Sequence, residues 1–371
     1  MMSHKPIHVV INALHAKSGG GVVFFNHIVP LLAENGGLEI SVVAHEDYAN
    51  RLDIPKNVKL EKVSFKGGFY KTLIWEQLCL PSLIRGLGAD VTFNMANYGP
   101  LFAPKPMVYV TNNPEVGKYS KGFFAKIYWP MLVFMTRLSL IFSPKSFSNG
   151  SYMQQVYAGG IWRFLQKKMV IATTACDVKV DLPVKKNKGQ VVAIGDFYIQ
   201  KNYPTLLRAF AAVKEKRLDA HLFIVGRAVS AEIEDELKSL VLSLDLEKNI
   251  TFCGVLPHNE VQALLACSEV YVSPSDAEAF SLTLLEAMSL GTAAVVRQHA
   301  FQYELAGDNA AHYVSVQAHE KNSVIPLADA ILEVLDNGKL RHGYEKKGLE
   351  VAHKYSWEKS AQTICDTIKS L

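Results

Sequence analysis

The sequence predicts an α/β protein built from two Rossmann-like, doubly wound domains that face a cleft. Three observations lead to this prediction. Short β-branched runs alternate with longer helical patterns, which is typical of βαβ units and a parallel sheet. The alternation stops once, at the polar stretch 181–189, and then restarts. A length of 371 residues suits two domains, and a hydrophobic content of 49% provides for a large core.

The first half carries one helix and four strands that the pattern predicts. A glycine loop at residues 18–21 separates the first strand from the helix. In chain order, the expected elements are a strand over 7–11, a helix over 22–34, and strands over 39–44, 91–94 and 107–110.

The second half repeats the alternation over about 170 residues, which is within the usual size of a domain. Placing the boundary in the polar linker gives domains 1–182 and 183–355. The expected strands cover 190–194, 220–225, 250–252, 270–273 and 293–296, and the expected helices cover 203–214, 231–244, 259–266 and 281–289. Ligands of open α/β sheets bind at the carboxyl ends of the strands, so a shared cleft is one interpretation and two unrelated sites are the other.

The charge is divided unevenly along the chain. The net charge is +4, but residues 1–180 hold 19 basic and 10 acidic side chains, while residues 181–371 hold 20 and 25. The halves therefore carry +9 and −5. A basic N-terminal half indicates contact with an anionic surface or substrate, and chance scatter is the alternative. We expect no nucleic-acid partner.

The five cysteines form no C-x-x-C pair, and their number is odd. This argues against a disulfide framework and a structural zinc site. The N-terminus has no apolar region of the signal-peptide kind. The expected setting is the reducing cytoplasm.

An aromatic segment, residues 123–142, is long enough to suggest a membrane span. Lys126, Pro130 and Arg137 interrupt it, so the sequence argues against a span. Two interpretations remain: a helix buried in the N-terminal domain, or a helix lying in a membrane interface. Burial is the more frequent arrangement, whereas the flanking lysines favour the interface.

Residues 273–291 carry the strongest functional pattern. Glu278 lies in a loop after an expected strand, and Glu286 lies one turn into the following helix. Ser281 suits the N-cap of that helix. The N–H groups of Ser281, Leu282 and Thr283 would then be available to a phosphate, and Glu286 would be placed to bond a ribose diol.

This stretch, P-S-x-x-E-x-F-x-x-x-x-L-E-A-M-x-x-G, resembles the donor-site signature of the family 4 retaining glycosyltransferases, which have the GT-B fold. Further matches follow in order along the chain. They are Gly19–Gly21; Trp75-Glu76-Gln77 with Leu80-Pro81, as in bacterial polysaccharide members; residues 146–151; Ile194-Gly195 with Lys201-Asn202; and Tyr355–Trp357. The resemblance also implies that residues 356–371 form a helix crossing back to the N-terminal domain.

The resemblance implies roles for particular residues. Glu278 would bond hydroxyls of the donor sugar, and Glu286 would bond the nucleotide ribose. The diphosphate would be bound by Lys201 with Asn202, by the helix start at 281–283 and by the loop of Gly19, Gly20 and Gly21. Backbone near Val255 would contact the base. No cofactor or metal is expected, because Lys201 and the helix supply positive charge and no Asp-x-Asp triplet is present.

The sequence also departs from the family pattern. Asp196 stands where the family has a phosphate-binding arginine, so Arg208 or Arg227 would have to replace it, or diphosphate binding is weakened. Asn112 stands where a histidine is frequent; it can orient a sugar hydroxyl but cannot titrate. The turn at residues 173–177 is altered, and Ser281 replaces a glycine.

The expected function is transfer of a hexose from a nucleotide sugar, with retention, to a polysaccharide or lipid-linked oligosaccharide. The expected location is the inner face of the cytoplasmic membrane, where the basic, aromatic N-terminal domain would contact anionic lipid. Two alternatives share the fold: a nucleotide-sugar 2-epimerase and a catalytically impaired scaffold. A dehydrogenase is disfavoured, because Gly19–Gly21 is not a G-x-G-x-x-G motif.

Overall fold

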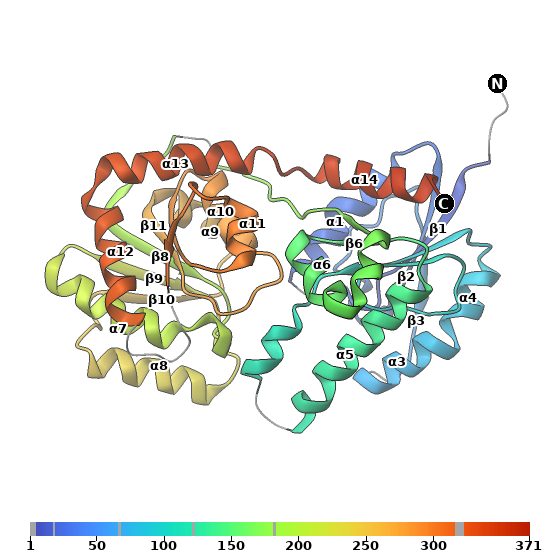
Figure 1. Cartoon of the computed structure of the whole chain (residues 1–371), viewed down its shortest axis with the longest axis horizontal. Coiled ribbons are helices and arrows are strands. Elements are labelled where there is room, and N and C mark those ends of the chain that lie inside the picture. Colours follow the sequence, from blue (N-terminus) through green and yellow to red (C-terminus); the bar gives the residue numbers. More distant parts are fainter. Residues whose placement is uncertain (1–4, 18, 66–67, 121–122, 181–182, 316–322) are drawn as a thin grey trace. The chain divides into compact units, whose positions relative to one another are not determined.

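The computed structural model describes residues 5–17, 19–65, 68–120, 123–180, 183–315 and 323–371. The chain forms two compact units (Figure 1). The N-terminal unit comprises Met1–Gly117, Lys121–Thr174 and Ser356–Leu371, and the C-terminal unit comprises Lys118–Ser120 and Ala175–Tyr355.

The N-terminal unit is built on a parallel sheet with the strand order β3-β2-β1-β4-β5-β6-β7. Its strands are β1 (Ile7–Asn12), β2 (Leu38–His45), β3 (Lys59–Val63), β4 (Val91–Asn94), β5 (Pro106–Val110), β6 (Ser146–Ser148) and β7 (Met169–Ile171). The central strands are almost wholly buried, as expected of a parallel sheet covered by helices on both faces.

The helices around this sheet are α1 (Gly20–Ala33), α2 (Glu46–Ala49), α3 (Phe69–Leu78), α4 (Leu80–Gly86), η1 (Pro114–Tyr119), α5 (Phe123–Phe142), α6 (Ser151–Ala158), η2 (Gly160–Lys168) and α14 (Trp357–Lys369). Helix α14 packs beside α1 (Figure 1). Ser356 caps its start by accepting a hydrogen bond from Lys359 N at 3.2 Å. The Trp357 ring stacks on His27 at 4.6 Å between centroids, which fixes the last helix to the N-terminal unit.

The C-terminal unit has a parallel sheet with the order β10-β9-β8-β11-β12-β13. The chain starts at β8 in the centre, moves outward through β9 and β10, and returns to β11 on the other side. The strands are β8 (Asn187–Ile194), β9 (His221–Val225), β10 (Ile250–Gly254), β11 (Ser268–Ser273), β12 (Ala293–Arg297) and β13 (His312–Val314). The reversal between β8 and β11 is the point where such sheets bind ligands.

Helices flank this second sheet, and apolar clusters separate them from it. They are η3 (Ile199–Lys201), α7 (Tyr203–Lys216), α8 (Ala231–Ser243), α9 (His258–Cys267), α10 (Leu282–Ser289), α11 (Ala300–Ala306), α12 (Val324–Asp336) and α13 (Gly338–Ala352). One cluster joins α7 and α12 to the sheet, and a second joins α9 and α10 to its other face. Cys176, Val180 and Val184 pack on this second cluster, which explains why the unit begins at Ala175, before the expected linker.

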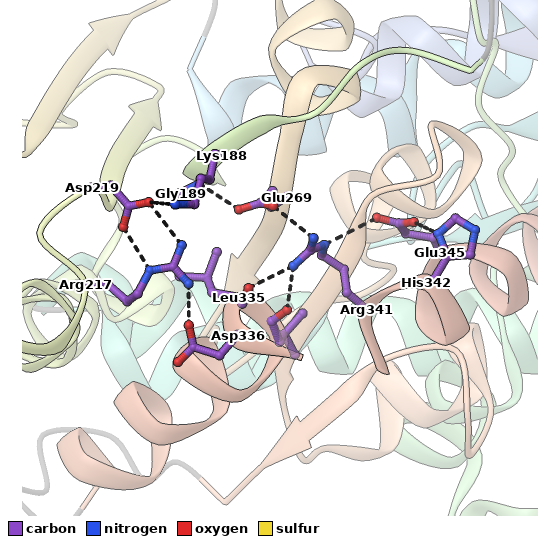
Figure 2. Close-up of polar contacts among 11 residues, drawn as sticks. Lys188, Gly189, Arg217, Asp219, Glu269, Leu335, Asp336, Arg341, His342 and Glu345 are labelled. Atoms are coloured by element: carbon purple, nitrogen blue, oxygen red, sulfur yellow. Dashed lines mark hydrogen bonds and ion pairs between the residues drawn. The ribbon is translucent and has the colours of Figure 1, made fainter. Parts of the chain in front are cut away.

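An ion-pair network ties the amino edge of the second sheet to α13 (Figure 2). Arg341 bonds Glu269 at 3.0 Å, and Glu269 accepts a hydrogen bond from Gly189 N at 2.7 Å. Arg341 also donates to the carbonyls of Val334 and Leu335 at 3.1 and 2.9 Å. These contacts satisfy the arginine within the protein. A cavity of about 490 Å³ that it helps to line lies at the same amino edge, opposite to the ligand edge.

Of the two interpretations of the aromatic segment, burial in the N-terminal domain does not describe it. Residues 123–142 form α5, but only 22% of its apolar window is buried. Leu132, Thr136 and Leu140 are buried on one face, while Phe124 and Phe134 on the remaining surface are 75% and 60% exposed. By length and hydropathy, α5 is the one helix among the described residues that could cross a membrane.

The hydrophobic pattern of the sequence does not predict strands that are short or charged. β3 contains three charged side chains and is only partly buried, because it lies at the sheet edge. β6, β7 and β13 are each three residues long. The linker expected at 181–189 is shorter than predicted, since β8 begins at Asn187; Asp181 and Leu182 lie outside the described residues, as do Ser18 of the glycine loop and Lys121.

Candidate functional site

The carboxyl edge of the C-terminal sheet carries a buried ion pair at the strand reversal. Lys201 follows β8, and Glu278 follows β11, the neighbouring strand. Lys201 Nζ lies 2.6 Å from Glu278 Oε1, and the two side chains are only 18% and 16% exposed. Burial alone would lower the pKa of Lys201, but Glu278, with smaller contributions from Tyr271 and Asp196, raises that pKa above its usual value. Lys201 is therefore held protonated beside Glu278 at the ligand edge.

Two glycines let the backbone approach this lysine. Gly195 has φ +142°, and a Cβ there would lie 2.9 Å from Lys201 Cε. Gly226, after β9, has φ +139°, and a Cβ there would lie 2.3 Å from the Gly195 carbonyl oxygen. Both positions therefore require glycine, and Gly195 places Lys201 over the end of β8.

The loop carrying Glu278 is fixed by contacts that the sequence analysis missed. Asp276 Oδ1 accepts a hydrogen bond from Arg297 Nη1 at 2.5 Å, and Asp276 N donates to Gln200 O at 2.7 Å. The second contact joins the Glu278 loop to the residue before Lys201. An arginine at the end of β12 was the available signal, because charged groups at carboxyl ends of parallel strands meet at one edge.

The first turn of α10 differs from the expected phosphate cradle in two respects. Ser281 precedes the helix, but its side chain caps nothing; its buried Oγ has no hydrogen-bond partner among the described residues. Leu282 N is not free, because it donates to Phe280 O at 2.9 Å. Ser281 therefore occupies the predicted N-cap position without a capping bond from its side chain, and the prediction of Leu282 as a free donor is wrong. The N–H groups of Ser281 and Thr283 have no partner within the described part of the chain.

Tyr271 connects this helix start to the ion pair. Its hydroxyl lies 2.6 Å from Thr283 Oγ1. Burial raises the pKa of Tyr271, and the charges of Lys201 and Glu278 act on the same hydroxyl. Thr283 and the Lys201–Glu278 pair thus both act on Tyr271, and the donor-binding role of Thr283 stays a prediction. Tyr271 is a further residue that the sequence analysis missed, since it lies within a strand that reads as core.

Glu286 lies on the same helix, one turn further along, and is largely buried. Its Oε1 is 4.0 Å from Nε2 of His258, at the start of α9. Burial raises the pKa of the Glu286 carboxyl to about 7. A ligand that donates hydrogen bonds to this buried carboxyl, as a ribose diol does, would stabilise it.

Asp196, the acid that departs from the family pattern, is paired with an arginine. Its Oδ1 accepts a hydrogen bond from Arg227 N at 3.1 Å, and its Oδ2 lies 3.4 Å from Arg227 Nε. Arg208 instead donates to Pro204 O, one turn back on its own helix. Of the two arginines considered from the sequence, Arg227 is therefore the one beside Asp196.

Two further predicted donor residues occupy different environments. Asn202 has φ +54° between η3 and α7, and its buried Oδ1 accepts a hydrogen bond from Thr205 Oγ1 at 2.7 Å. Its Nδ2 has no partner among the described residues. Val255 follows β10 at the same sheet edge, and its side chain is 70% exposed. Asn202 thus shapes the turn after Lys201, whereas Val255 is available at the surface.

The remaining predicted residues belong to the N-terminal unit. Gly19, with φ +59°, precedes α1, and Gly20 and Gly21 form its exposed first turn. Asn112 follows β5, and its backbone is held by Asn97 Oδ1 at 2.8 Å and by the Tyr157 hydroxyl at 2.7 Å. The Asn112 side chain is exposed. That the glycine loop and Asn112 contact the nucleotide sugar stays a prediction.

In the described ranges, no group of three or more His, Cys, Asp or Glu residues is placed to hold a metal ion. The polar groups at the ligand edge include Lys201, the carboxyls of Glu278 and Glu286, the hydroxyls of Tyr271 and Thr283, and free N–H groups. This set can bind an anion next to a polyol.

Known proteins are similar to this chain over part or almost all of its length. Residues 177–351 match the model of the family "Glycosyl transferases group 1". A phosphatidyl-myo-inositol mannosyltransferase of Mycobacterium leprae is 30% identical over 167 residues, which is 44% of this chain and 42% of that protein. The chain thus spans about two fifths of the length of the curated relatives it matches.

Solved structures match over almost the whole chain. Sucrose-phosphate synthase from Thermosynechococcus elongatus superposes with a TM-score of 0.78 and 16% identity, covering 98% of each chain. HepE of Anabaena, in complex with UDP-glucose, superposes with a TM-score of 0.74 and 14% identity, covering 98% of this chain and 100% of that one. The fold is therefore GT-B, with two Rossmann-like parallel sheets.

Proposed function

Because residues 177–351 belong to the glycosyl transferase group 1 family, we propose that this chain transfers a hexose from a nucleoside-diphosphate sugar to a sugar hydroxyl, with retention and without a metal. The observation that carries the proposal is the Lys201–Glu278 pair at the reversal of the C-terminal sheet. A cation beside free N–H groups suits a diphosphate, and an adjacent carboxylate suits sugar hydroxyls.

Each group at the ligand edge has a task in this proposal. Lys201 and the N–H groups of Ser281 and Thr283 bind the diphosphate and stabilise the charge that develops as it leaves. Glu278 accepts hydrogen bonds from the hexose, and Glu286 accepts them from the ribose. Arg227, beside Asp196, supplies the guanidinium that the family places one strand away.

The reaction needs no nucleophile from the protein. The bond between the anomeric carbon and the phosphate oxygen breaks, and a bond to the acceptor oxygen forms on the same face of the sugar. The proton of the acceptor hydroxyl passes to the leaving phosphate. The contribution of the protein is to position both substrates and to stabilise the departing diphosphate.

The acceptor is proposed to be a polysaccharide or lipid-linked oligosaccharide at the inner face of the cytoplasmic membrane. Exposed apolar side chains on the N-terminal unit support contact with lipid; they include Phe102, Phe124, Phe134, Phe142, Ile161 and Phe164. Exposed Lys126 and Arg163 lie on the same elements, α5 and η2. Aromatic and basic side chains together favour an anionic interface. The relative in Mycobacterium leprae is named for a lipid acceptor.

A panel of radiolabelled nucleotide sugars, incubated with the protein and a membrane lipid extract, tests the proposal. We expect one donor to release its nucleoside diphosphate and to label a lipid or glycan. Glu278→Ala should lower kcat at least tenfold, because it removes contacts to the reacting sugar. Glu247→Ala, at an exposed site of the same unit, is the matched control.

Three outcomes would contradict the proposal. Conversion of the nucleotide sugar to an epimer without transfer would identify an epimerase. Failure to bind any nucleoside diphosphate would identify a scaffold. Equal activity of the Glu278→Ala and Glu247→Ala variants would show that the ion pair does not belong to the active site.

A further inference from the structure

A second polar cluster lies in the N-terminal unit, at the carboxyl ends of β1 and β4. These strands are neighbours at the strand reversal of that sheet, where α/β sheets bind ligands. Asn12 ends β1 and Asn94 ends β4, and Asn12 Nδ2 donates to Asn94 Oδ1 at 3.0 Å. Glu76 from α3 and His15 from the loop after β1 complete the cluster.

The centre of the cluster is the carboxylate of Glu76, which is completely buried. Its Oε1 accepts a hydrogen bond from Asn12 Nδ2 at 2.7 Å, and its Oε2 lies 2.9 Å from His15 Nε2. Burying a carboxylate is costly unless its oxygens are bonded. Both oxygens have partners here, so the cluster is a fixed arrangement.

The neighbours of Glu76 anchor α3. The Trp75 ring stacks on Phe65 with centroids 4.7 Å apart. The Gln77 amide donates to Gly99 O at 3.0 Å and accepts from Leu101 N at 3.2 Å. These neighbouring contacts also hold α3, and Glu76 adds the contact to His15.

This contact decides which nitrogen of His15 carries the proton. A carboxylate only accepts hydrogen bonds, so Nε2 is the donor and Nδ1 of the neutral ring has a lone pair. The His15 side chain is 23% exposed, and Nδ1 has no hydrogen-bond partner within the described part of the chain. The Tyr98 ring contacts the imidazole edge-on at 5.1 Å and restricts its rotation.

We propose that His15 is a binding residue for the acceptor, with Nδ1 accepting a hydrogen bond from a hydroxyl of a sugar or other polyol. Glu76 is the positioning residue that fixes the tautomer. This inference rests on the proposed function, because a glycosyl acceptor must present a hydroxyl. A hydroxyl donor matches a neutral, partly exposed nitrogen acceptor, whereas an anionic ligand does not.

The test uses the full chain and the nucleotide sugar that the wild-type protein turns over. Water, octyl β-D-glucopyranoside and octyl α-D-mannopyranoside are the acceptor probes. His15→Ala should lower kcat for donor hydrolysis at least tenfold and raise the KM of any glycoside that is used. The donor KM should stay within twofold. His15→Gln, which keeps an acceptor oxygen, should recover part of the loss.

Glu76→Gln separates positioning from folding. The glutamine amide can donate a hydrogen bond to Nε2 of His15, which moves the ring proton to Nδ1. Nδ1 then cannot accept a hydrogen bond from the acceptor hydroxyl. We therefore expect a lower kcat and a higher KM for the acceptor at an unchanged Tm. Unchanged hydrolysis in His15→Ala would overturn the proposal. An equal rise of the donor KM in His15→Ala and Glu76→Gln would also overturn it, because it would show that the His15–Glu76 contact only stabilises the structure.

A measurement independent of turnover completes the test. In protein labelled with ¹⁵N-histidine, the resonances lost in His15→Gln identify His15. We expect the Nε2–H tautomer in the wild-type protein and a different tautomer in Glu76→Gln. An Nδ1–H ring in the wild-type protein would overturn the inference. If no nucleotide sugar is turned over, the proposed function fails while this measurement still decides the state of His15.

Discussion

Replacing Glu286 by glutamine should make the stability of the protein less dependent on pH. Burial raises the pKa of this carboxyl from 4.5 to about 7. The folded state therefore holds a proton that the unfolded state releases between these values. A raised carboxyl pKa contributes stability below pH 4.5, and that contribution is lost as the pH rises through 7.

The size of the effect follows from the shift. One pKa unit corresponds to about 1.4 kcal/mol, so a shift of about 2.5 units gives about 3 kcal/mol between pH 4.5 and pH 8.5. A glutamine avoids this cost, because it is neutral at both pH values. For a unit of about 180 residues, 3 kcal/mol corresponds to roughly 6–12 °C in Tm.

Calorimetric melting at pH 4.5 and pH 8.5 measures this difference. The Tm of Glu286→Gln relative to wild type should be higher at pH 8.5 than at pH 4.5 by that amount. Glu350→Gln, at an exposed position on α13, should show no such difference. A Tm difference that is equal at both pH values would refute the reasoning. The same variant should raise the donor KM, and an unchanged value would refute the contact with ribose.

Three other predictions test the fold and the membrane surface. Gly226→Ala should destabilise the protein by about 2 kcal/mol or more in urea unfolding, because the backbone conformation of Gly226 and the adjacent carbonyl exclude a Cβ. As a control, Gly343→Ala should stabilise the protein by about 0.5–1 kcal/mol, because Gly343 lies on a helix with open space around it. Trp357→Ala should cost about 3–5 kcal/mol and expose the last helix to trypsin. Phe134→Glu should abolish sedimentation with vesicles of 30% anionic lipid at low salt, whereas Leu242→Glu on the exposed face of α8 should not.

The sequence predicted the centre of the candidate site because its residues directly follow strands. Lys201 and Glu278 come after β8 and β11, and ends of adjacent parallel strands meet wherever the sheet forms. The same rule brings Arg297, at the end of β12, to this edge, but its bond to Asp276 depends on the path of an irregular loop and was not predicted. That loop is also fixed by the hydrogen bond from Asp276 N to Gln200 O.

Other features depended on tertiary contacts that local patterns do not contain. Glu76 lies 61 positions from His15, and no periodicity links a helix residue to a loop residue at that distance. Serine is a residue type that often caps helices, and Ser281 stands at the N-cap position. Its ψ of 76°, however, leaves the side chain without the capping hydrogen bond. The apolar composition of α5 fits burial and exposure equally, and only packing decides between them.

The most direct test of the account is calorimetric titration of UDP and GDP into the wild-type protein, Lys201→Ala and Lys188→Ala. Lys188 is an exposed lysine of the same unit, so both variants lose one positive charge. We predict that the wild-type protein binds at least one of the two nucleotides, that Lys201→Ala binds it at least tenfold more weakly, and that Lys188→Ala binds it unchanged. Equal affinity for Lys201→Ala and the wild-type protein, or no binding of either nucleotide, would contradict the assignment of the donor site.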